Sequence, residues 1–166
     1  MMNTRWIKTV AISVLFLTTH ALAEPTLPCT FENSGVNLRS FKTSKYVSGF
    51  TEIKRKKDYS GSLNKIGGFY LELFACVHHG AKITVLLGPE INPSHLKKVL
   101  SVLPNLLFPE AHSKQVQNAL LAIPQETLFE RTHLNQLALS LGLSDASIQL
   151  LNAEGMHVLV FEFYGG

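Results

Sequence analysis

Residues 67–77 read GGFYLELFACV and residues 82–88 read KITVLLG, two runs rich in β-branched and aromatic side chains. Gly80 and Ala81 stand between these runs, and a short connection that contains glycine predicts a β-hairpin. The chain closes with MHVLVFEFY, which is apolar on both faces and therefore predicts a central strand. We expect a mainly antiparallel sheet that contains residues 66–77, 83–88 and 156–164.

Between the hairpin and the last strand, the apolar residues follow the spacing of helices. One helix is expected over residues 93–103, after an Asn92 cap and before Pro104. Two more are expected over residues 109–123 and 132–142, ended by a proline and a glycine respectively. Three or four short helices should therefore pack on one face of the sheet, and the expected fold class is α+β.

The signals before residue 65 are mixed. YVSGFTEI at residues 46–53 is typical of a strand, whereas SGS at 60–62 and NSG at 33–35 are typical of turns. We expect one domain, in which an irregular and basic segment, residues 24–64, is tied to an α+β core, residues 65–166.

The first 23 residues have the layout of a secretory signal peptide. Arg5 and Lys8 form a positive n-region, and residues 10–17 form an apolar core that is too short to span a bilayer comfortably. Residues 21–23, Ala-Leu-Ala, are a small-x-small cleavage site. We expect cleavage after Ala23 and a periplasmic or secreted protein with no stable membrane span.

The two cysteines, Cys29 and Cys76, are predicted to form a disulfide, because an exported chain matures in an oxidising compartment. The alternative for Cys76 is metal binding with the His78–His79 pair. Adjacent residues in a strand point to opposite faces, however, so the two histidines cannot hold one ion together. Neither HExxH nor CxxC occurs, and no metal or cofactor is expected.

Most of the basic character of the chain belongs to the leader. The whole sequence has 15 Lys and Arg against 12 Asp and Glu. Two of the bases precede Glu24, so the predicted mature chain has thirteen bases against twelve acids. A general affinity for nucleic acid is therefore not indicated. The exception is a run of four cations, Lys54, Arg55, Lys56 and Lys57, which predicts either a solvated loop or edge, or a contact for an anionic partner.

Residues 137–152, LALSLGLSDASIQLLN, resemble the helix-turn-helix of phage-repressor-type regulators. The resemblance rests on Leu-Ala at 137–138, Leu-Gly at 141–142, Leu-Ser at 143–144 and Ile148. It implies that residues 145–151 form a helix that enters the major groove, so that residues 132–152 would bind DNA. This alternative requires a chain that is not exported, and residues 145–151 contain no Lys or Arg for phosphate contacts.

Catalytic motifs are sparse. There is no Gly-x-Ser-x-Gly elbow, Walker loop or Gly-x-Gly-x-x-Gly. Ser-x-x-Lys occurs at residues 62–65 and again at 94–97, without the Ser-Asp-Asn and Lys-Thr-Gly that accompany it in penicillin-interacting enzymes. No catalytic residue is assigned.

The sequence favours a small exported binding protein without catalysis, which acts on a protein partner in the envelope or outside as an inhibitor or immunity-type protein. The main alternative is an exported hydrolase or thiol enzyme whose site is assembled from residues distant in sequence.

Overall fold

The computed structural model describes residues 36–53, 58–74 and 79–165, and all structural statements below refer to them. They form one antiparallel sheet in the order β1-β2-β3-β4-β7-β6-β5. The strands are β1 Val47–Ile53, β2 Asp58–Leu63, β3 Gly67–Phe74, β4 Gly80–Gly88, β5 Thr132–His133, β6 Leu143–Ala153 and β7 Met156–Gly165. The helices are α1 Leu38–Thr43, α2 Pro93–Leu107, α3 Glu110–Leu121, the 3₁₀ helix η2 Gln125–Phe129, and α4 Asn135–Leu141. The α+β class is confirmed.

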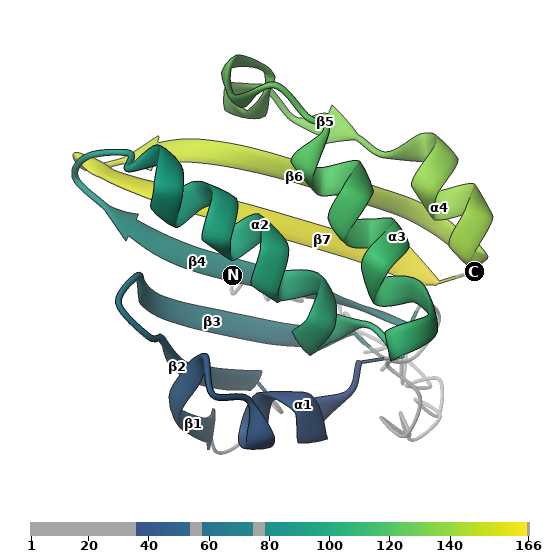
Figure 1. Ribbon diagram of the computed structural model, residues 1–166, viewed down its shortest axis with the longest axis horizontal. Coiled ribbons are helices and arrows are strands. Elements are labelled where there is room, and N and C mark those ends of the chain that lie inside the picture. The colour runs from purple at the N-terminus through teal and green to yellow at the C-terminus, as the bar shows by residue number, and fades with distance from the viewer. Residues whose placement is uncertain (1–35, 54–57, 75–78, 166) are drawn as a thin grey trace, which may run out of the picture.

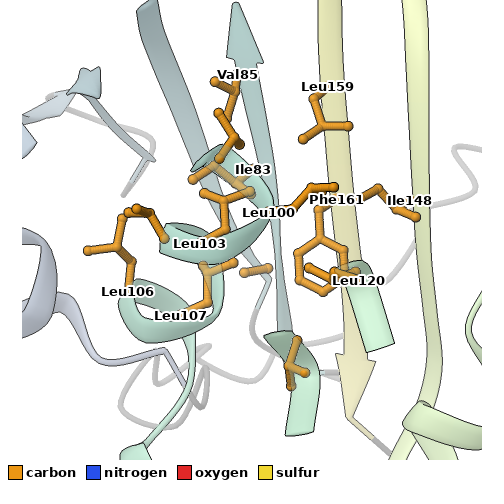
Figure 2. Close-up of a cluster of buried hydrophobic side chains, with 14 of the residues drawn as sticks. Ile83, Val85, Leu100, Leu103, Leu106, Leu107, Leu120, Ile148, Leu159 and Phe161 are labelled. Atoms are coloured by element: carbon orange, nitrogen blue, oxygen red, sulfur yellow. The ribbon is translucent and has the colours of Figure 1, made fainter. Parts of the chain in front are cut away.

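The helices lie on one side of the sheet, as Figure 1 shows with α2 and α3 across the centre and α1 beside β1 and β2. The core is the layer between them. Figure 2 shows side chains from β4 and β7, such as Ile83 and Phe161, meeting Leu103 of α2 and Leu120 of α3. All four are at most 1% exposed. Every second residue of β4 and β7 points into this layer, so the other residues form a second sheet face, called the open face below.

The strands predicted first are confirmed: residues 67–74 are β3, residues 80–88 are β4, and β7 lies in the interior of the sheet between β4 and β6. The predicted position of the turn is wrong, because Gly80 and Ala81 already belong to β4 and pair with Phe74 and Leu73. A Cβ on Gly80 would lie 2.1 Å from the Phe163 carbonyl oxygen, so this glycine allows close strand approach rather than a turn.

The segment before residue 65 is more regular than expected. The strand predicted at residues 46–53 is confirmed as β1, and α1 precedes it. SGS at 60–62 is not a turn but part of β2. Gly61 faces the Phe69 ring, where a Cβ would meet Phe69 Cζ at 2.8 Å, so packing explains the glycine. The NSG prediction at residues 33–35 lies outside the described residues.

The first long helix does not stop at Pro104. Asn92 caps it as predicted, with Oδ1 accepting a hydrogen bond from Ser94 N at 2.9 Å, but α2 runs on to Leu107. A proline inside a helix costs about 3 kcal/mol. The next turn offsets this cost by placing Leu106 and Leu107, 2% and 0% exposed, in the core.

The helix predicted over 132–142 begins later, because Thr132 and His133 form β5 and α4 starts at Asn135. Gly142 ends α4 as predicted, with φ +67°.

Residues 145–151 are strand β6 and not a helix, which contradicts the helix-turn-helix resemblance. Ala146, Ile148 and Leu150 are buried at 1% exposure each and face the helices, and the residues between them face away. This alternation has the period of a strand. The DNA-binding alternative therefore loses the helix that would read the major groove. Within the described residues, no helix is long and apolar enough to cross a membrane.

Candidate functional site

A groove of about 400 Å³ opens on the helical side of the molecule, between the first half of α2, the end of α3 and η2. We call it the α2–α3 groove. Most of its lining is apolar: Pro93, Leu96, Leu100, Leu121, Ile123 and Leu128, with Lys97 and Gln125 as the polar members.

The end of α3 and the segment that follows it form one wall of the groove. The last helical residue is Leu121, and Pro124 then starts η2, which is held by a hydrogen bond from Thr127 Oγ1 to the Pro124 carbonyl at 2.8 Å. Leu128 fixes η2 to the core at 0% exposure, while Leu121 and the neighbouring Phe129 stay 38% and 48% exposed. A buried apolar floor thus meets exposed apolar residues at the rim.

The open face of the sheet carries a row of four charges. Three lie on the successive strands β3, β4 and β7, and the fourth is Arg131, in the loop before β5. Glu72 of β3 pairs with Lys82 of β4 at 3.1 Å. Glu162 of β7 is in register with Lys82 and forms an ion pair with Arg131. The Arg131 guanidinium also donates a hydrogen bond of 3.2 Å to Ser147 Oγ of β6. Ser147 donates in turn to Glu162 at 3.1 Å. This charged row, Glu72–Lys82–Glu162–Arg131, alternates in sign.

One end of the open face is apolar. Leu86, Leu151 and Met156 are 45%, 39% and 38% exposed, and Val158 lies in register with Leu86 and Leu151. A hollow of about 430 Å³ extends from these residues to the charged row, lined by Lys82, Thr84, Arg131, Gln149, Leu151, Ala153, Val158, Val160 and Glu162.

The tyrosines of the open face are held in the protonated form. Tyr70 donates a hydrogen bond of 2.5 Å to Asp58, which raises the pKa of its hydroxyl to about 12. Burial raises the pKa of Tyr164, and the negative charge of Glu162 adds to the effect. At neutral pH both hydroxyls are donors, which suits binding and positioning rather than proton abstraction.

Most of the site residues predicted from the sequence lie outside the residues that the structure describes. Cys29, Cys76, His78 and the cations 54–57 are outside the described residues, so the disulfide and the cationic contact stay predictions. His79 is described and exposed. Across residues 36–53, 58–74 and 79–165, no group of three metal-binding side chains occurs.

The structure brings together residues that sequence reasoning did not single out. The α2–α3 groove is lined by residues some 30 positions apart in the sequence, so no local sequence pattern predicts it. The charged row had one signal: Glu162 is a lone carboxylate in the apolar run that forms β7. An acid in a central strand needs a partner, and Arg131 could have been sought for that reason.

Comparison with protein-family models, with curated proteins and with solved structures gives no match.

Proposed function

We propose that this chain is an exported, non-catalytic binding protein, which holds another protein in the cell envelope or outside, as an inhibitor or an immunity-type protein does. Export is supported by the leader of residues 1–23, and the binding role by the α2–α3 groove. The groove is the single observation that carries the proposal.

The groove suits a protein partner because of its composition. Protein interfaces place a desolvated apolar centre inside a polar rim, and a few anchor side chains in pockets supply most of the binding energy. Here Leu96, Leu100 and Leu128 form the floor, and Lys97 and Gln125 are the polar lining. An inserted Leu or Phe of the partner would gain about 1.5–3 kcal/mol from burial alone.

Phe129 and Leu121 extend the apolar surface beyond the groove. A partner that inserts an anchor would therefore also cover these two side chains, and a polar substituent at the rim should weaken binding without disturbing the core. The cations at positions 54–57 remain a predicted second contact, for an acidic part of the partner.

The test compares two Leu→Glu variants of the tagged protein, expressed with its own leader in the source organism. Leu121→Glu puts a charge on the groove rim, whereas Leu139→Glu makes the same change on α4 at a site that is 83% exposed and outside the groove lining. We expect the unsubstituted protein and Leu139→Glu to retain one discrete envelope protein, and Leu121→Glu to lose it. Equal retention by both variants would rule out the groove as the binding site. Thermal unfolding of both variants checks that they fold.

A further inference from the structure

The charged row has a property that pairing within one chain does not require. Read across β3, β4, β7 and β6, its charges are negative, positive, negative and positive, with Arg131 supplying the last charge above Ser147. The cross-strand pairs Glu72–Lys82, Lys82–Glu162 and Ser147–Glu162 are directly in register, so the four charges lie in one line perpendicular to the strands. If a second copy of this line is laid against it end for end, each charge faces a charge of the opposite sign.

We propose that the open face binds the open face of a second copy. The two-fold axis runs parallel to the strands, in the interface above the sheet, midway between β4 and β7. The rotation reverses the line. Glu72 then faces Arg131 of the second copy, and Lys82 faces Glu162 of the second copy, so four interchain ion pairs form. This site is separate from the α2–α3 groove, and the inference does not depend on the proposed partner.

The shape of the open face fits the same axis. The hollow lies over β4, β7 and β6, and the rotation places β7, β4 and β3 of the second copy above it. Tyr70 lies on β3 and Leu86 on β4. The register then places Tyr70 opposite Gln149 of the second copy and Leu86 opposite Val158 of the second copy. At the opposite end, Phe74 and Tyr164 flank Gly80 in register, and their rings stack with centroids 5.3 Å apart, so each copy presents an aromatic pair to the other.

The charges enter this interface already paired. Each of Lys82 and Arg131 has an acid in its own chain, and their side chains remain 36% and 49% exposed. Docking therefore joins the two ion pairs of each copy to those of the other and leaves no buried charge without an opposite partner, which avoids the large cost of an unpaired buried charge.

The area is sufficient for association. Strands about 4.8 Å apart with a rise of about 3.4 Å per residue give a face of roughly 20 by 25 Å. Covering it on both copies removes roughly 1,000 Å², the lower limit for a specific interface. Stacked twisted sheets cross at about 30°, so the axis should lie about 15° from the strands.

Charge-reversed variants provide the test, measured by sedimentation equilibrium on protein expressed from the full sequence. The unsubstituted protein should be a dimer at micromolar concentration. Lys82→Glu brings two acids together across the axis, and Glu162→Lys brings two bases together, twice each by symmetry. Each variant alone should dissociate at least about a hundredfold more readily.

Mixing the two variants should restore the dimer. The acid introduced by Lys82→Glu in one copy then faces the base introduced by Glu162→Lys in the other, and the symmetry-related pair keeps its original residues. Restoration also shows that both variants are folded. A monomeric unsubstituted protein overturns the proposal, as does a dimer that Lys82→Glu leaves intact, since it would use another face. Variants that stay monomeric after mixing, although circular dichroism shows them folded, also overturn it.

Discussion

Individual residues on the open face take their chemistry from the register of the sheet. Tyr70 and Asp58 are twelve positions apart, yet neighbouring strands bring the phenol and the carboxylate within 2.5 Å. The hydrogen bond and the negative charge both favour the protonated phenol, so the pKa of Tyr70 rises to about 12.

We expect Tyr70 to ionise last among the tyrosines whose pKa is raised. A raised pKa in the folded state contributes stability below the ordinary pKa of 10.0, and this contribution is lost as the pH rises from there through about 12. Spectrophotometric titration of the phenols should show a step near pH 12 that moves toward 10 in Asp58→Asn. The step should be absent in Tyr70→Phe. A step unchanged by Asp58→Asn would contradict the assignment.

Little at this scale could be predicted from the sequence. The pairs Tyr70–Asp58 and Arg131–Glu162 join residues of different strands or loops, and their contact depends on strand order, which no local pattern specifies. Cap residues are different, because their signal is local: Asn92 and Gly142 both act where the sequence placed them.

At the scale of elements, the strands with a continuous apolar and β-branched pattern could be predicted, whereas the strand formed by residues 143–153 could not. Residues 143–153 contain apolar side chains at both helical and strand spacing, since Leu143, Ala146 and Leu150 fit one period and Ala146, Ile148 and Leu150 fit the other. Residues 143–153 pair with β7 at ten register positions, and this pairing favours the strand over the helix. Tertiary pairing of this kind routinely overrides local preference.

Alternation along β6 gives a mutational test. Ile148→Ala removes a side chain that is 1% exposed and should lower the free energy of unfolding by about 3 kcal/mol. Gln149→Ala, on the open face, should lower it by a clearly smaller amount, because Gln149 is only half-buried and lies outside the core. Urea denaturation measures both. Similar losses at the two positions would argue against a strand with one buried face.

At the scale of the whole molecule, the strand and helix patterns predicted an α+β domain, and the structure confirms this fold class. The leader predicts export, which stays a prediction. The remaining question of covalent structure concerns Cys29 and Cys76. A disulfide that closes a loop of this length stabilises a protein by about 4 kcal/mol in the chain-entropy model.

We expect protein expressed with its own leader to begin at Glu24 and to have an intact mass two hydrogens below that of the dithiol. It should react with an alkylating reagent only after reduction, and reduction should lower its stability by about 4 kcal/mol. A full-length species with two reactive thiols would contradict both the leader and the disulfide.

The central claim is that the molecule has two separate binding surfaces, one for a partner protein and one for its own copy. The most direct measurement is photo-crosslinking in the source organism, with a photoreactive residue placed at position 121, 86 or 139 in turn. We predict a discrete adduct with another protein from position 121, an adduct of twice the chain mass from position 86, and neither from position 139. If positions 121 and 139 give the same products, the groove is not a binding site and the proposed function is wrong.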